Sequence, residues 1–191
     1  MRPDFETNTR ALQRQSVSAL IVLSNATSPR RPVGFRKAIV PDPFASHTTA
    51  KLLLEPLGLE RELGEDEIDE LQKLAAETRH VAEALVNNRL PPSIDTINRL
   101  AGQGRGTQTL RIEIDGTLSV DVRWHSDTAV IELACRIMAE LGRFDPARLR
   151  RCAREACDLF FYDTTRSRTQ RWHSESTCGQ RERQDRWKKI H

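Results

Sequence analysis

Residues 152–178 read CAREACDLFFYDTTRSRTQRWHSESTC and contain three of the four cysteines in this chain of 191 residues. Together with one histidine they form two pairs, Cys152-x4-Cys157 and His173-x4-Cys178, which are separated by 15 residues. Zinc accepts thiolate sulfur and imidazole nitrogen together, and two ligand pairs joined by a spacer can close a tetrahedron around the ion. The pattern predicts one structural Zn²⁺ per chain, bound by all four side chains.

Two other interpretations of these thiols stay open, namely a disulfide pair and unrelated core cysteines. A disulfide requires an oxidising compartment, and Asp4 and Glu6 stand where a secretory signal peptide carries positive charge. We therefore expect a cytoplasmic protein with reduced thiols. The fourth cysteine, Cys135, falls on the apolar side of an expected helix, where a small buried side chain is the ordinary interpretation.

The net charge of +3 is distributed unevenly along the chain. Residues 148–191 carry twelve Arg and Lys against six Asp and Glu, a net charge of +6, so residues 1–147 have a net charge of −3. A basic segment of this kind points to a polyanion such as nucleic acid as a partner. The longest apolar run, residues 19–23, is far too short to span a bilayer, so no membrane partner is expected.

Residues 1–48 are polar, and we expect little regular structure there apart from a short strand at residues 18–23. Prolines interrupt the second half of this segment, at Pro29, Pro32, Pro41 and Pro43. The sequence therefore predicts that the ordered part of the chain begins near Thr49.

Residues 49–147 show helical periodicity interrupted by one hairpin signal. Helices are expected before Gly58, over residues 65–87 and on both sides of the hairpin. Two segments alternate apolar and polar residues around Asp115-Gly116, which is typical of an antiparallel hairpin with a two-residue turn. The fold class expected is α+β: a mostly helical N-terminal domain with this β-hairpin, followed by a small zinc finger made of a β-hairpin and a helix over residues 148–191.

The C-terminal residues include an aromatic run, residues 160–162, followed by a basic stretch. Residues 160–162 are expected to form a strand that buries one face over the metal, with Trp172 packing from a returning strand. Residues 164–168 place hydroxyl and guanidinium groups on a turn, and residues 179–191 are expected to form a basic helix. Glu182 and Asp185 interrupt the basic field, so attraction to phosphates is a firmer expectation than base reading. The candidate nucleic-acid contacts are Arg166, Arg168, Arg171, Arg181, Arg183, Arg186 and Lys188.

One zinc finger family has a cysteine pair, an aromatic residue, Asp followed by Ser or Thr, a basic stretch, Trp-Cys and Cys-Gly-Asn-Arg. The corresponding residues here are Cys152, Cys157, Phe161, Asp163-Thr164, Arg168, Arg171-Trp172-His173 and Cys178-Gly179-Gln180-Arg181. The segment thus resembles the CGNR zinc finger. It departs from that pattern at His173, which replaces a cysteine, and at Gln180, which replaces the asparagine. Imidazole is an ordinary zinc ligand, so the site is retained.

The preceding residues look like the ABATE domain that usually accompanies this finger, with helices and a hairpin before the junction at residues 149–152. The resemblance implies a bacterial, stress-induced transcription regulator. We therefore expect a DNA-binding regulator in which zinc is structural and no reaction is catalysed.

Alternatives to this function remain. Zinc can also stabilise a protein-protein interaction or ligand-sensing module that binds no DNA, with a protein partner or small ligand at the N-terminal domain. His173-Ser174-Glu175 matches a fragment of zinc deaminases, but the downstream Pro-Cys-x-x-Cys of those enzymes is missing. The sequence does not decide the DNA target, the choice between DNA and RNA, the inducing signal or the oligomeric state.

Overall fold

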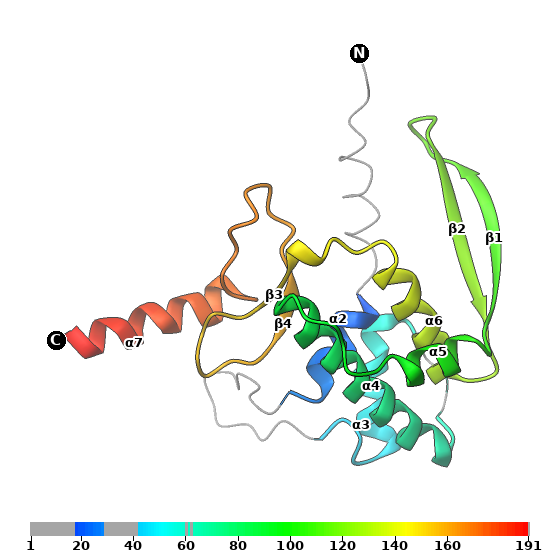
Figure 1. Ribbon diagram of the computed structural model, residues 1–191, viewed down its shortest axis with the longest axis horizontal. Coiled ribbons are helices and arrows are strands. Elements are labelled where there is room, and N and C mark those ends of the chain that lie inside the picture. The colour runs from blue at the N-terminus through cyan, green and yellow to red at the C-terminus, as the bar shows by residue number, and fades with distance from the viewer. Residues whose placement is uncertain (1–17, 29–41, 60, 62, 191) are drawn as a thin grey trace.

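The computed structural model describes residues 18–28, 42–59, 61 and 63–190. Helices α2 to α6 form a helical body, from which a long hairpin and a C-terminal module, residues 148–190, extend in different directions (Figure 1). None of the described helices combines the length and the apolar character needed to cross a membrane. In chain order the elements are α2 (Ala19–Ala26), α3 (His47–Leu54), η1 (Glu55–Leu57), α4 (Glu65–Val86), α5 (Asp95–Ala101), β1 (Arg105–Ile112), β2 (Leu118–His125), α6 (Ala129–Leu141), η2 (Pro146–Arg148), β3 (Leu149–Arg151), β4 (Phe160–Tyr162), η3 (Glu175–Gly179) and α7 (Gln180–Ile190).

Helix α2 contradicts the expected strand at residues 18–23 and the expectation that order begins near Thr49. Its Leu20 and Leu23 are fully buried against the other helices of the body. Glu140 of α6 accepts hydrogen bonds from the Ser18 hydroxyl and the first helical N–H groups over 2.7–3.0 Å. A short apolar run does not distinguish strand from helix, and here packing decides. Residues 1–17 and 29–41, with Pro29, Pro32 and Pro41, lie outside the described residues, whereas Pro43 lies in the described turn before α3.

The helices expected in the body are confirmed. Helix α4 runs the length of the body and buries Leu71 and Leu74 in its core. The helical segment α3–η1 ends at Gly58, whose φ of +67° is accessible to glycine at little cost. Helix α6 starts at the N-cap Thr128, whose hydroxyl accepts a hydrogen bond from the Ile131 N–H. Cys135 is fully buried on α6, as expected for a small apolar side chain.

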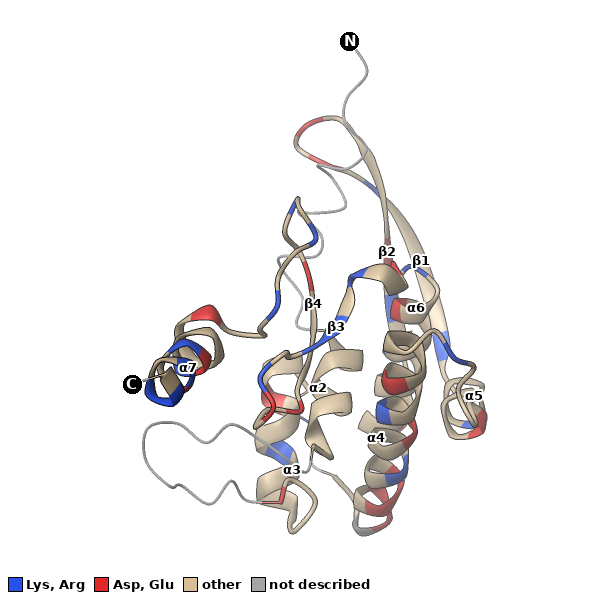
Figure 2. Cartoon of the chain, turned by 60° about the vertical axis from the view of Figure 1, so that its left-hand side comes forward, with Lys and Arg blue, Asp and Glu red and all other residues tan. Residues whose placement is uncertain are grey.

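The β1–β2 hairpin is antiparallel, with Leu110 opposite Val120. It differs from expectation in its turn, because the Glu113 N–H bonds to the Thr117 carbonyl and leaves a loop of residues 114–116. Within this loop only Gly116 has a positive φ, +80°, as in a three-residue hairpin loop. Every residue of β1 is exposed, and the hairpin rises well beyond the helices (Figure 2).

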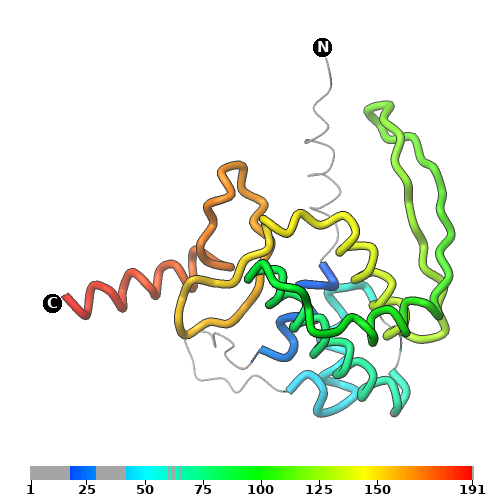
Figure 3. Tube along the Cα trace, in the orientation of Figure 1, coloured from blue at the N-terminus to red at the C-terminus, as the bar shows by residue number. Residues whose placement is uncertain are grey.

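The C-terminal module contains the expected hairpin and terminal helix. Strands β3 and β4 pair antiparallel, and the chain then makes a loop before η3 and α7, which projects from the molecule (Figure 3). The expectation that β4 covers the metal is wrong, because Phe160 packs against Ala82 of α4 and Leu149. The returning strand at Trp172 is also absent from the described module; the Trp172 side chain still packs against the cysteines.

Polar contacts join the module to the helical body. The side-chain amide of Asn25 in α2 donates to the carbonyl of Phe160 over 2.9 Å and accepts from its N–H over 2.8 Å. Arg79 of α4 forms a buried ion pair with Asp158 and stacks on the Phe160 ring at 5.2 Å. The module therefore shares a core with α2 and α4 instead of hanging from the body by a linker.

Candidate metal centre

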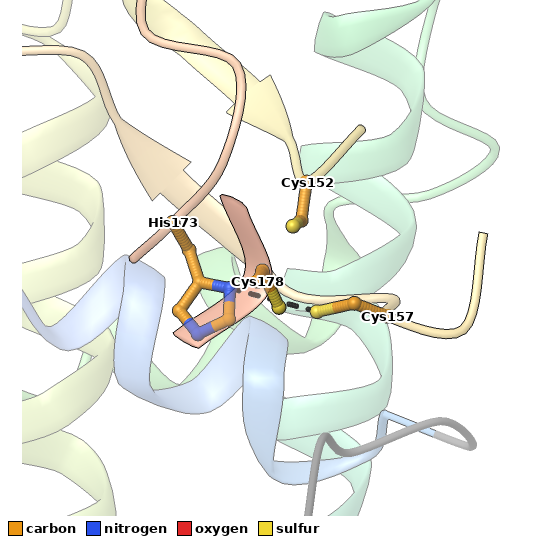
Figure 4. Close-up of side chains that lie close together, drawn as sticks. All are labelled: Cys152, Cys157, His173 and Cys178. Atoms are coloured by element: carbon orange, nitrogen blue, oxygen red, sulfur yellow. Dashed lines mark hydrogen bonds between the residues drawn. The ribbon is translucent and has the colours of Figure 1, made fainter. Parts of the chain in front are cut away.

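Four side chains converge at the base of the C-terminal module (Figure 4). The sulfur atoms of Cys152, Cys157 and Cys178 and a ring nitrogen of His173 all lie within 4.8 Å of one another. A tetrahedral zinc ion with bonds of about 2.3 Å to sulfur holds its ligand atoms roughly 3.8 Å apart. The four predicted ligands thus need only a small contraction to bind one ion, and the expectation of a convergent site is confirmed.

Backbone hydrogen bonds fix the ligand positions. Cys152 follows β3 and donates its N–H to the Leu159 carbonyl over 2.9 Å, while Cys157 ends a turn that begins at Arg154. Cys178 lies in the single π-helical turn η3 and bonds to the carbonyl of Ser174 over 3.0 Å. A further 2.9 Å bond, from the Ala153 N–H to the Arg171 carbonyl, ties the first ligand pair to the second. The site is therefore built by the local chain path around each pair.

The thiols cannot all ionise without a nearby positive charge. A hydrogen bond from Cys157 holds the pKa of the Cys152 thiol far below its ordinary value. The same bond, together with burial, raises the pKa of Cys157, and burial beside the Cys152 charge raises that of Cys178. A divalent cation would supply the missing charge and stabilise three thiolates at once.

The surroundings suit a structural ion. The three cysteines are buried, and Trp172 and Leu159 pack against them. His173 is half-buried, with its Nδ1 3.5 Å from the sulfur of Cys157. All four cysteines of the chain are free thiols in this structure, the state that a metal site requires. Four protein ligands complete a tetrahedron and leave no coordination position for a reacting water.

Asp163 organises the basic loop of residues 164–171, a role that the ligand spacing did not reveal. Its fully buried carboxylate accepts hydrogen bonds from the backbone and hydroxyl of Thr165 and from the Gln170 N–H over 2.5–3.0 Å. Burial acts to raise its pKa, but these bonds and the charge of Arg150 outweigh burial and lower it. The signal in the sequence is the Asp-x-Thr spacing of a side-chain-capped turn.

The structure places the three loop arginines on the exposed side of this loop. Arg166 is exposed, and Arg171 is exposed with its guanidinium 5.0 Å from the Trp172 ring centroid. Arg168 has a φ of +53° and lies 3.4 Å from the Asp145 carboxylate. A buried carboxylate thus fixes the loop and leaves its cations at the surface.

Helix α7 carries the other four candidates, and none of its residues is buried. Arg186 lies in a groove between α7 and the loop that links Cys152 to Cys157. The acidic residues Glu182 and Asp185 line the same groove, and Asp185 pairs with Arg154 over 3.1 Å. Arg181 and Lys188 lie about two turns apart on another face. Arg183 pairs with Glu175 over 2.5 Å. The acids that interrupt the basic field in the sequence are thus segregated to one side of the helix.

Comparison with known families identifies the module. Residues 148–189 match the CGNR zinc finger. The match covers all four ligands of this CGNR finger, both strands and nearly all of α7, and the finger carries a cluster suited to one zinc ion. No curated protein matches the chain. The likeness of the preceding residues to the ABATE domain stays a prediction.

Proposed function

We propose that this chain is a zinc-dependent, DNA-binding transcription regulator in which zinc is structural and the CGNR finger contacts DNA phosphates. One observation carries the proposal: the finger exposes basic side chains on two elements, the loop of residues 164–171 and helix α7, while part of its acidic charge is buried. Asp163 and Asp158 are buried, and Glu182 and Asp185 line the groove. Basic charge gathered on one small module is the electrostatic footprint of a nucleic-acid-binding protein.

Helix α7 suits a groove of DNA in particular. It projects from the finger as an exposed helix (Figure 1), and Arg181, Gln184 and Lys188 follow one another at helical spacing on one face. A helix carried on a zinc site is a common reader of the major groove, and arginine and glutamine can bond to base edges. The arginine loop, held by Asp163, supplies a second contact to the sugar-phosphate backbone.

The salt dependence of binding to a random DNA duplex tests the proposal. Each phosphate contact contributes about −0.9 to the slope of log K against log salt concentration. We expect Lys188→Ala and Arg166→Ala each to weaken binding and to reduce the steepness of that slope by about one contact. Lys51→Ala, which removes an exposed lysine of α3 in the helical body, is the matched control and should leave both quantities unchanged.

The zinc content of each variant must equal that of the unmodified chain, so that a lost contact is not confused with a lost fold. Absence of DNA binding by the zinc-loaded protein, or slopes that are the same for all variants, would contradict the proposal. That result would favour the alternative, an interaction or ligand-sensing module.

A further inference from the structure

The β1–β2 hairpin is amphipathic, yet its apolar side is bare. Antiparallel register places alternate residues of both strands on one side. We call four of them the apolar face of the hairpin: Leu110, Ile112, Leu118 and Val120, which are 64%, 78%, 64% and 52% exposed. Two cross-strand pairs, Leu110 with Val120 and Ile112 with Leu118, make up this face. Side chains of this kind in a strand pair normally lie against a core.

The opposite side of the hairpin is polar, and its side chains pair with one another through an ion pair and hydrogen bonds. Arg111 pairs with Asp121 over 2.8 Å, and the His125 ring lies 3.1 Å from the Thr107 hydroxyl. Near the turn, Ser119 donates a hydrogen bond to Glu113. This side resembles an ordinary solvated sheet surface, so the two sides of the hairpin differ sharply in character.

At its base the apolar side is covered by the protein itself. Trp124, on the same side by register, packs against the core of the helical body and lies close over Gly106. A Cβ at Gly106 would come within 2.8 Å of the indole ring, so this contact requires glycine. The buried surface begins at Trp124 and gives way to the bare apolar face toward the tip. An isolated two-stranded sheet is only marginally stable in water, so a cover over that face would stabilise it.

We propose that the apolar face of the hairpin binds the same face of a second copy of this chain, forming a two-fold symmetric dimer. The face carries no charge, so two identical copies can approach without repulsion, as an isologous interface requires. Four side chains exposed to this extent present on the order of 500 Å² of apolar surface, at the upper end of what a monomer leaves bare. With its rim, the face approaches the roughly 800 Å² per partner found in stable interfaces.

Other partners fit this surface less well. Nucleic acid requires cations, and the face has none. A membrane surface would meet the tip first, where Glu113 and Asp115 stand; hydrogen bonds from Thr117 lower the pKa of Asp115, which therefore stays ionised. Two packed hairpins lie about 10 Å apart and bury both apolar faces, leaving the polar sides in solvent.

Sedimentation velocity over about 1–100 μM zinc-loaded protein, a range that brackets a micromolar dimer, tests the proposal. We expect concentration-dependent dimers, and we expect Leu110→Thr combined with Val120→Thr to weaken dimerisation at least about 100-fold, since threonine keeps the β propensity but removes apolar area. Leu90→Thr is the matched control: Leu90 is 93% exposed outside the hairpin, and its loss should change nothing.

A second measurement keeps the proposal testable if the double variant disturbs the hairpin. Val120→Cys places a thiol on the apolar face, and Thr109→Cys places one on the polar side of the same hairpin. A short bismaleimide should cross-link the first variant into dimers and leave the second monomeric. Monomers at every concentration, or equal cross-linking of the two variants, would overturn the proposal. Neither outcome depends on whether the CGNR finger binds DNA.

Discussion

His173 supplies the only nitrogen donor among the four side chains of the candidate metal site. Its ring nitrogen converges with three sulfur atoms because Ser174 caps η3 and the Ala153–Arg171 backbone bond holds the preceding segment. A tetrahedral zinc ion requires a suitable donor atom at the right position, and both imidazole nitrogen and thiolate sulfur are suitable donors. The identity of residue 173 therefore matters less than the backbone that presents it.

We expect His173→Ala to lower the affinity for zinc at least about 100-fold, because it removes one of four ligands from a closed shell. His173→Cys should retain one zinc ion per chain, since it restores a donor at the same position. His80→Ala, which changes an exposed histidine of α4, serves as the control. Competition with a chromophoric chelator measures the affinity, and tight stoichiometric zinc in His173→Ala would remove this residue from the ligand set.

At the scale of elements, glutamates of one helix repeatedly accept hydrogen bonds from the N–H groups at the start of another helix. Glu140 of α6 receives the first N–H groups of α2, and Glu67 of α4 accepts from Ala129 at the start of α6. Glu77 of α4 accepts from the N–H groups of Thr96 and Ile97 in α5 over 3.2 and 2.8 Å. Each carboxylate satisfies exposed donors at the positive end of a helix. These links orient the helices of the body as well as capping them.

Glu77→Gln should lower the free energy of unfolding by roughly 1 kcal/mol at neutral pH, the usual cost of losing a helix cap. Burial alone would raise the pKa of Glu77, but bonds from α5 and from Ser93 outweigh it and hold that pKa below the ordinary 4.5. The stabilisation is therefore complete above about pH 4.5 and is lost as the pH falls through the lower, folded-state pKa.

Urea unfolding between pH 4 and 7 measures this contribution. The loss of unfolding free energy caused by Glu77→Gln is compared at each pH with the loss caused by Asp69→Asn. Asp69 is an exposed carboxylate of the same helix, so its variant controls for the change in net charge. A difference between Glu77→Gln and the unmodified chain that grows on acidification would contradict the assignment of Glu77 as a cap.

The molecule as a whole is joined through the buried pair of Arg79 and Asp158. Arg79 also bonds to the Ser24 carbonyl over 3.2 Å and to Glu83 over 3.0 Å, while Asp158 receives Arg151. Asp158 follows the ligand Cys157 directly, so the metal loop and the helical body share one polar contact. Because the finger is joined to the body through this contact, we expect the loss of a zinc ligand to disturb α2 and α4 as well as the finger.

Removal of zinc by a chelator should therefore increase amide hydrogen exchange in α2 as well as in the CGNR finger. Arg79→Met should reproduce part of this effect and destabilise the fold by about 3 kcal/mol, because it leaves the buried Asp158 with a single partner. Arg99→Met, which breaks the exposed pair with Glu70, is the matched control and should cost less than about 1 kcal/mol. Unchanged exchange in α2 after chelation would show that the finger and the body are independent.

The sequence by itself determined the zinc ligands, the helices α4 and α6 and the existence of both hairpins. Ligand identity, pair spacing and helical periodicity are local properties, and each can be recognised within a short stretch of sequence. The sequence also indicated that His173 can replace a cysteine as a ligand, because the ability of imidazole to bind zinc is a property of the side chain itself.

Only the tertiary structure decided which surfaces are covered. It turned residues 19–26 into a core helix, docked Phe160 against α4 and not over the metal, and left the hairpin's apolar face bare. It also moved Glu182 and Asp185 to the groove side of α7. Burial depends on contacts between residues far apart in the chain, such as Ser18 with Glu140 or Arg79 with Asp158, and no local pattern encodes those partners.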